Sequence, residues 1–101
     1  MDNQLRPFLV ELTLPEFTDE FVALIPEQRA IVERYMSAGS ITSVSLAADR
    51  SRCWFTMVAA TIGEIENILA EFPISAFSDA QIIPLMFQEH PYLNVTHFSL
   101  N

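Results

Sequence analysis

The chemistry that this sequence can support centres on Glu11. Its carboxylate follows Leu9 and Val10 and precedes Leu12, in a segment typical of a strand. Apolar neighbours of this kind desolvate a carboxylate and raise its pKa, because burial disfavours the charged form. A carboxylate tuned in this way can accept a proton and return it near neutral pH, which is what a cofactor-free isomerisation needs. We therefore take Glu11 as the candidate catalytic residue.

Three further side chains are candidates for binding a substrate. Arg50 and Arg52 belong to a short polar segment and can hold a carboxylate through paired guanidinium hydrogen bonds. Trp54, two residues later, can stack on a planar ligand. Each side chain also has a structural interpretation: the arginines as solvated turn residues or ion-pair partners of Glu11, and Trp54 as a core or interface anchor. The sequence leaves both interpretations open.

Several kinds of site are excluded or disfavoured by the residues that the chain lacks. There is no lysine, which excludes Schiff-base catalysis and covalent attachment of pyridoxal through a lysine. Gly39 and Gly63 are the only glycines, so neither a P-loop nor a Rossmann fingerprint can be written. His90 and His97, seven residues apart, match no compact metal motif. We expect neither a cofactor nor a metal ion.

Composition limits the partners of this 101-residue chain. Its net charge of −8 disfavours nucleic acid, because proteins bind nucleic acid largely through Lys and Arg. Its apolar runs fall far short of the roughly 18 residues of a membrane span, so we expect no membrane partner. The first residues lack a signal-peptide pattern and Cys53 is the single cysteine, which together favour a cytoplasmic protein. Half of the residues are apolar, which suggests self-association.

The apolar segments of the chain predict four strands. Residues 8–14 form the first strand, which Pro15 ends because proline cannot donate to a strand ladder. The next two strands, at 41–48 and 52–60, are joined by a short turn that lacks glycine and therefore favours type I geometry. The fourth strand lies within 77–87 and is centred on Gln81, Ile82 and Ile83.

Two main helices connect these strands. Thr18 caps a short helical turn, and a longer helix is expected from Pro26, in its first turn, to Gly39, a typical C-terminal glycine. Thr61 and Glu64 form a capping box at the start of the second helix. The residues spaced to form the apolar face of this helix are Ile65, Ile68, Leu69 and Phe72.

The resulting order, βαββαβ, is that of a ferredoxin-like fold. We therefore expect an α+β protein with a four-stranded antiparallel sheet whose helices cover one face. One domain spans residues 1–87, and the apolar residues of the tail, 88–101, predict that it packs on this domain or on a neighbouring subunit. A shift of one residue in the register of the first strand would turn Glu11 from the open face to the helices.

The sheet face away from the helices is expected to be unusually apolar. Whichever alternate residues face the helices, the opposite face keeps several members of one apolar set, comprising Leu9, Val44, Leu46, Trp54, Val58, Ile83 and Leu85. An exposed apolar patch of this size indicates an interface. The simplest closed assembly is a twofold homodimer in which the two sheets lie face to face.

These segments resemble the muconolactone isomerase family over residues 8–87. The resemblance rests on Phe8-Leu9-Val10-Glu11 with Leu14-Pro15, on the hairpin around residues 49–52, and on Glu64 to Leu69 followed by Phe72-Pro73-Ile74. It implies a dimeric α+β barrel built from two ferredoxin-like subunits, with assembly beyond dimers in some members. It also implies an enzyme that moves a proton within a lactone ring without metal or cofactor. The polar hairpin and the tail with His90 and His97 depart from the family's pattern.

Two functions stand as hypotheses. In the first, a small apolar acid or lactone enters a cleft beside the sheet, where Glu11 moves a proton while an arginine orients the substrate carboxylate. In the second, the same cavity only binds a hydrophobic metabolite or is filled by the partner subunit, and the protein is a non-catalytic small-molecule-binding or assembly module. An open pocket beside Glu11 favours the enzyme, and a closed interior favours the module. Haem-degrading or oxygenase chemistry, seen in related barrels, lacks an axial histidine outside the tail.

Overall fold

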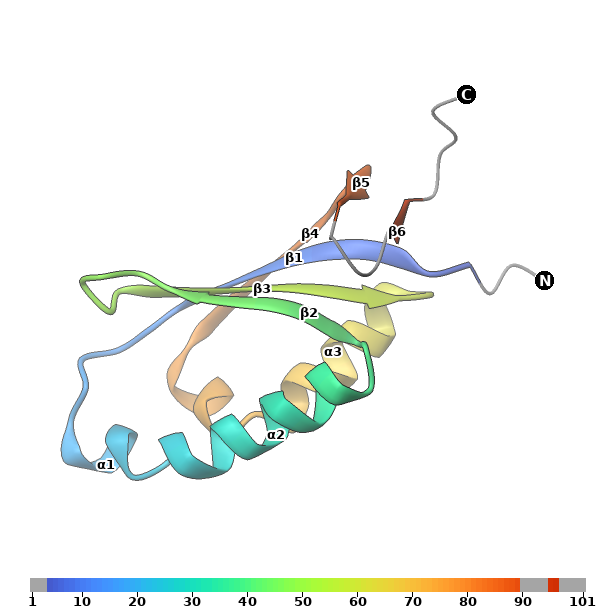
Figure 1. The fold of residues 1–101 in the computed structure, drawn as a ribbon. Coiled ribbons are helices and arrows are strands. Elements are labelled where there is room, and N and C mark those ends of the chain that lie inside the picture. Colours follow the sequence, from blue (N-terminus) through green and yellow to red (C-terminus); the bar gives the residue numbers. More distant parts are fainter. Residues whose placement is uncertain (1–3, 90–94, 97–101) are drawn as a thin grey trace.

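The computed structural model describes residues 4–89, 95 and 96. Its elements are β1 (Arg6–Thr13), α1 (Asp19–Val22), α2 (Ile25–Ser37), β2 (Ile41–Leu46), β3 (Arg52–Ala59), α3 (Ile62–Ala70), the 3-10 helix η1 (Pro73–Phe77), β4 (Asp79–Pro84), β5 (Phe87–Gln88) and β6 (Val95–Thr96). The main sheet has the order β2-β3-β1-β4, and every pair is antiparallel. The helices α2 and α3 lie on one side of it (Figure 1). The predicted α+β class with a four-stranded antiparallel sheet is confirmed, and this arrangement is compatible with a ferredoxin-like fold.

The turn between β2 and β3 explains why β2 is shorter than predicted. The strand ends at Leu46, because residues 47–51 form the turn. Within it, the amide of Arg50 donates to the carbonyl oxygen of Ala47 at 2.9 Å, and the Asp49 carboxylate accepts from the amide of Ser51 at 3.0 Å. Arg50 has a φ of 64°, in the left-handed region that favours glycine. The turn thus closes without glycine, and Arg50 instead adopts the left-handed backbone conformation, which is strained for a residue with a side chain.

Both predicted helix caps are present. The Thr18 hydroxyl accepts from the amide of Phe21 at 3.2 Å, and the Thr61 hydroxyl accepts from the amide of Glu64 at 3.3 Å. The Glu64 carboxylate bonds back to the amide of Ala60, at 2.9 Å, one residue before the cap. Between these two caps, α2 carries a proline in its first turn and is followed by the predicted glycine, which has a positive φ of 85°. Local sequence signals therefore set the helix ends.

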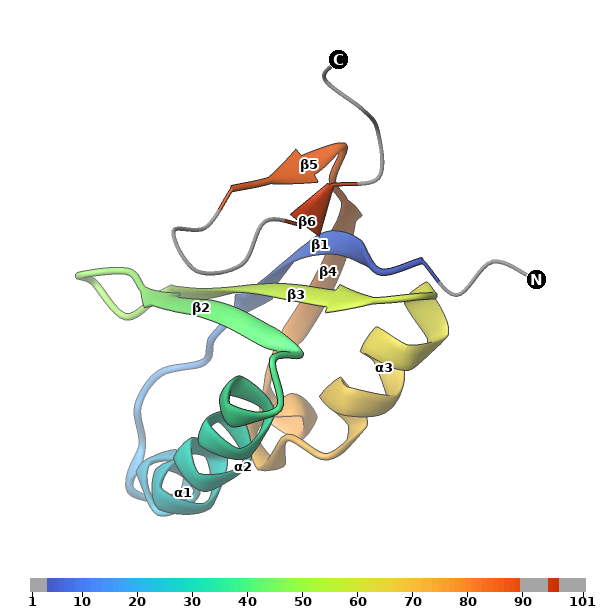
Figure 2. The ribbon, with the colours of Figure 1, turned by 45° about the vertical axis from the view of Figure 1, so that its right-hand side comes forward.

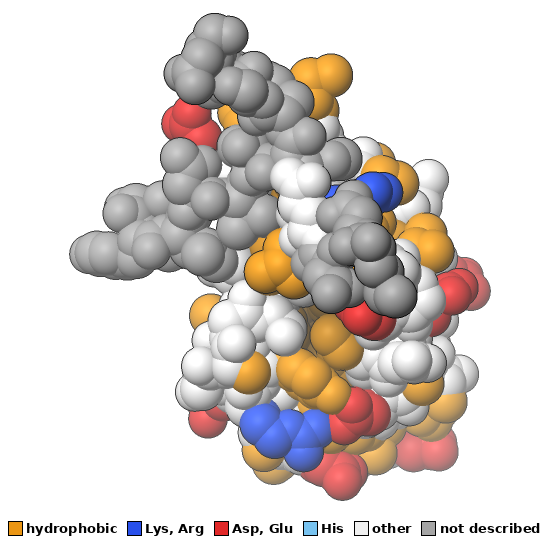
Figure 3. Space-filling view, turned by 90° about the vertical axis from the view of Figure 1, so that its right-hand side faces the viewer, with side chains coloured by type: hydrophobic (Ala, Val, Ile, Leu, Met, Phe, Trp, Pro, Cys, Tyr) orange, Lys and Arg blue, Asp and Glu red, His pale blue; other side chains and the backbone are white. Residues whose placement is uncertain are grey.

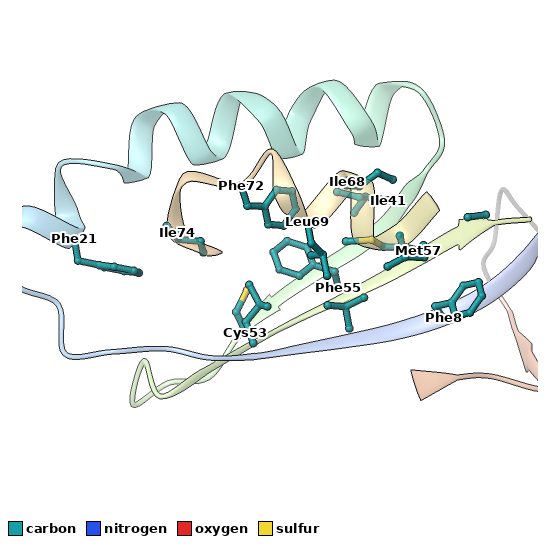
Figure 4. Packing of buried hydrophobic residues seen from close by; sticks show 14 residues of the cluster. Phe8, Phe21, Ile41, Cys53, Phe55, Met57, Ile68, Leu69, Phe72 and Ile74 are labelled. Atoms are coloured by element: carbon teal, nitrogen blue, oxygen red, sulfur yellow. The ribbon is translucent and has the colours of Figure 1, made fainter. Parts of the chain in front are cut away.

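The hydrophobic core lies between the helices and the inner face of the sheet (Figure 4). In β1 the buried side chains alternate along the strand as Phe8, Val10 and Leu12. The rings of Phe55 and Phe72 lie 5.3 Å apart between centroids and join β3 to the segment after α3. All four residues of the predicted apolar helix face are buried, namely Ile65, Ile68, Leu69 and Phe72.

The outer face of the sheet differs from the predicted one because β2 contains a bulge. The register between β2 and β3 shifts by one residue between Ile41 and Ser43. Since successive side chains of a strand point to opposite faces, the extra residue turns Val44 and Leu46 to the helix side. These two side chains therefore do not belong to the outer apolar set. The register places Leu9, Trp54, Val58 and Ile83 of that set on the outer face, and Leu85 follows the end of β4, where its amide donates to the carbonyl oxygen of Pro7 at 3.0 Å.

The last described residues lie against this outer face. Strands β5 and β6 pair with each other, on the side of the sheet away from the helices (Figures 1 and 2). The Gln88 amide nitrogen donates to the hydroxyls of Thr42, at 2.7 Å, and Thr56, at 2.9 Å. This part of the predicted tail thus contacts β2 and β3 of its own chain. His90 and His97, named in the sequence analysis, lie outside the described residues.

Apolar side chains also reach the surface of the molecule. Leu46 is 53% exposed and Met86 is 71% exposed. Figure 3 shows hydrophobic side chains as an orange strip at one end of the molecule, with arginine (blue) and acidic (red) side chains at its lower end. None of the helices within the described ranges is both long and apolar enough to cross a bilayer.

Candidate functional site

Glu11 and Trp54 form a pair on the outer face of the sheet. They are directly opposite in the register of β1 and β3, and the Trp54 indole nitrogen donates to a Glu11 carboxylate oxygen at 2.9 Å. Both side chains are half-buried. On the same face, the β4 residue opposite Glu11 is Gln81, and the next row away from the hairpin is apolar, with Leu9 opposite Ile83. The structure therefore joins two of the four predicted site residues by a hydrogen bond, and the partner of Glu11 is an indole rather than an arginine.

The two candidate arginines lie in different places. Arg52 is opposite Thr13, one row from Glu11 toward the hairpin, and lines an open hollow together with Trp54. The Arg50 guanidinium instead lies over the ring of Phe17, 5.5 Å from its centroid. This cation–π contact holds Arg50 at the loop after β1. Of the two, Arg52 is the one positioned to approach a ligand beside Trp54.

A cavity of about 400 Å³ lies on the helix side of the sheet. Its walls come from the loop after β1, from α1 and α2, from β2 and β3, and from η1. Most of the lining side chains are apolar, among them Phe21, Val32 and Phe55. The bulge in β2 adds Val44 and Leu46 to this wall. The described lining contains none of the four predicted site residues. The walls come from segments that are distant in sequence, so their meeting could not be predicted from local sequence patterns.

Gln28 is the polar side chain buried in this apolar lining, with 6% of its surface exposed. Its carbonyl oxygen accepts from the backbone amide of Ile74 at 3.5 Å. Its amide nitrogen has no hydrogen-bond partner among the described residues. Sequence reasoning missed Gln28, although a signal was present: it stands between Ile25 and Val32 at helical spacing, on an otherwise apolar stripe.

Two other kinds of polar group border the cavity. The Cys53 thiol is buried, and burial raises its pKa from 9.0 to about 11. A thiol with this pKa is protonated near neutral pH and is therefore a poor nucleophile. Arg29 and Glu33 are exposed residues of α2 that also line the cavity. They lie one helical turn apart and carry opposite charges.

Another polar cluster, away from the cavity, connects α2 to the end of α3 on the surface. The Arg34 guanidinium and the Tyr35 hydroxyl both donate to the Glu71 carboxylate. The bond from Tyr35, and after it the bond from Arg34, hold the pKa of Glu71 below its usual value, and the same bond raises the pKa of Tyr35. The side chains of Arg34 and Glu71 are 62% and 43% exposed and line neither hollow, so we assign the cluster a structural role.

No protein-family model matches the chain, and a search of curated proteins found no related one. The resemblance to the muconolactone isomerase family therefore stays a prediction. Within residues 4–89, no group of three or more His, Cys, Asp and Glu side chains is arranged to hold a metal ion.

Proposed function

We propose that this protein is a small-molecule-binding module that holds an apolar ligand between its helices and its sheet. The observation that supports this function is the apolar cavity of about 400 Å³ with a single buried amide in its wall. Ligand sites are typically concave and mainly apolar, with a few polar groups that orient the ligand. The cavity has this composition.

The side chains that line the cavity favour binding over catalysis. The Cys53 thiol, with a pKa of about 11, is neutral near pH 7 and is a poor nucleophile. Glu33 is exposed on α2 beside Arg29, so the described part of the wall contains no carboxylate enclosed by apolar side chains. Glu11 belongs to the opposite face of the sheet, bonded to Trp54. A ligand on the helix side is therefore held by packing.

Methyl NMR with α-methylstyrene as the probe tests this function. We expect its addition to shift the methyl signals of Val32, Val44 and Leu46, and to leave those of Leu9 and Ile83 unchanged. The variant Val32→Phe fills part of the cavity and should weaken binding, whereas Val22→Phe, an exposed position that does not line it, should not. Unchanged signals in the wall of the cavity would contradict the proposal.

A second candidate function is a cofactor-free isomerase in which Glu11 moves a proton. The observation that favours it is the pairing of Glu11 with Trp54 beside the apolar side chains of Leu9 and Ile83. In a homodimer with the sheets face to face, a second copy would enclose this pair and create a dry site. Arg52, one row away, could then orient the carboxylate of a small apolar acid or lactone.

Deuterium incorporation separates the isomerase from the binding module. We would incubate muconolactone-like enol lactones with the protein in heavy water and follow exchange of ring protons by NMR. If Glu11 is the base, exchange occurs with the wild-type protein and is lost in Glu11→Gln. Arg50→Gln, which changes the arginine held over Phe17, is the matched control and should retain exchange. Equal exchange by Glu11→Gln, or none by the wild type, would rule out this role for Glu11.

A further inference from the structure

The mouth of the cavity carries two opposite charges. Arg29 and Glu33 line the cavity and are both exposed, so they stand where its apolar wall meets solvent. They are one turn apart on α2, and side chains at this spacing are neighbours on one face of a helix, with about 5–6 Å between their Cβ atoms. A ligand whose apolar part occupies the cavity therefore has a cation and an anion within reach of its polar end.

Neither of these charges is taken up by another group. Arg29 and Glu33 form no ion pair with each other, and neither side chain has a hydrogen-bond partner among the described residues. Arg34, also on α2, differs in this respect because its guanidinium is bonded to Glu71. The two charged groups at the mouth thus remain available to a molecule that enters the cavity.

We propose that the cavity binds a free amino acid with a large apolar side chain, such as phenylalanine or leucine. Its carboxylate lies at Arg29, its ammonium group lies at Glu33, and its side chain occupies the cavity. This inference rests on the proposed binding function and specifies its ligand class. The cavity volume of about 400 Å³ is near the lower end of the range for small-molecule sites, which suits one such molecule.

The two charges favour a zwitterion over a ligand with a single charge. A plain carboxylic acid gains the attraction of Arg29 but meets the repulsion of Glu33, and for a plain amine the two effects are reversed. A zwitterion is attracted by both residues and, being neutral overall, is not repelled by the net charge of −8. Its charged groups stay at the exposed mouth, so binding avoids the high cost of burying a charge.

Ligands that lack one of the two charges test the proposal. We would measure dissociation constants by methyl NMR for L-phenylalanine, for hydrocinnamate, which lacks the ammonium group, and for phenethylamine, which lacks the carboxylate. Glu33→Gln should reduce the preference for L-phenylalanine over hydrocinnamate by about threefold, and Arg29→Gln should reduce the preference over phenethylamine by about as much. Comparing each ratio of constants between wild type and variant cancels the different hydration of the ligands.

Matched variants on the same helix control for the change in net charge. Glu27→Gln and Arg34→Gln remove the same charges from exposed positions of α2 that do not line the cavity, so they should give wild-type ratios. Each of the four variants places glutamine, a good helix former, at an exposed helical position, so we expect all of them to fold.

The outcomes separate this proposal from the binding function itself. L-Phenylalanine should shift the methyl signals of Val32, Val44 and Leu46, which line the cavity. A ratio that stays unchanged in either Arg29→Gln or Glu33→Gln would overturn the recognition of an amino acid. Binding of α-methylstyrene without binding of L-phenylalanine would do the same and leave the binding function intact. If neither ligand shifts these signals, both proposals fail.

Discussion

The burial of Cys53 makes its chemical reactivity a test of the packing around the cavity. Burial raises the pKa of this thiol from 9.0 to about 11, and only the thiolate reacts readily with alkylating agents. At about pH 8 the thiolate fraction of the folded protein is then about a hundredfold smaller than that of an ordinary thiol. We expect iodoacetamide to modify Cys53 at least this much more slowly in the native protein than in urea, as measured by mass spectrometry. Equal rates would mean that the cavity wall around Cys53 is open to solvent.

Glu71 gives the protein a stability contribution that depends on pH. The hydrogen bond from Tyr35, followed by that from Arg34, lowers the pKa of Glu71 below 4.5 in the folded state. A lowered folded pKa contributes stability above the unfolded pKa, and this contribution is lost as the pH falls through the folded pKa. The free energy of unfolding of Glu71→Gln should therefore lie below that of the wild type near neutral pH, and the two should converge in acid.

The effect of Glu71 is expected to be small because the cluster is exposed to solvent and salt. Urea unfolding from neutral pH to below the usual range of carboxylates measures it. Glu66→Gln removes an exposed carboxylate from α3 and controls for the loss of one negative charge. A difference between Glu71→Gln and the wild type that persists unchanged in acid would exclude the pKa of Glu71 as its cause.

Individual site residues were predicted by type but not by partner. Glu11 and Trp54 were both recognised as candidates, yet their hydrogen bond depends on the register of β1 against β3, which strand patterns leave open. Gln28 was missed, because its significance comes from Ile74, which lies 46 residues away in the chain and satisfies only one side of the amide. The chemistry of a site therefore depends on contacts that the local sequence does not encode.

Helix α3 depends on the hydroxyl of Thr61 for its first turn. This hydroxyl accepts from the amide of Glu64, one of the donors that a helix start leaves unpaired. Thr61→Ala should lower the free energy of unfolding by about 0.5–2 kcal/mol, whereas Thr61→Ser, which keeps the hydroxyl, should lower it much less. Urea unfolding of the three proteins measures this difference. Equal losses in both variants would attribute the effect to the methyl group of Thr61 rather than to the cap.

The elements were predictable to the extent that their signals are local. Both threonine caps, Pro15 after the first strand and the apolar spacing of the second helix act within a few residues, and the predicted elements appear at these places. The bulge after Ile41 was not predictable, because it is defined by the pairing of β2 with β3. Its consequence extends beyond the strand: by turning Val44 inward it helps to form the cavity.

At the level of the whole molecule, the order of elements was sufficient to predict the α+β class. The difference between the two sides of the sheet could not be predicted in this way, because it depends on how the elements pack. The helix side contains the cavity, and β5 and β6 lie beside part of the outer side. The two central rows of the outer side are Ser45-Trp54-Glu11-Gln81 and Ser43-Thr56-Leu9-Ile83. They carry one carboxylate, in a chain with 13 acidic residues. Depletion of charge is typical of the centre of a protein interface.

The proposed homodimer through this face can be tested with the single tryptophan of the chain. A second copy seated on the outer face would cover Trp54, so we expect a dimer by sedimentation and a shift of the tryptophan emission to the red on dilution. Ile83→Lys places a charge at a 36% exposed position of this face and should give a monomer with red-shifted emission. Val22→Lys, at a 46% exposed position on α1, changes the same kind of surface on the opposite side and should remain dimeric. A wild-type protein that sediments as a monomer at all concentrations would remove the enclosure that the isomerase requires for Glu11, while a ligand site on the helix side would be unaffected.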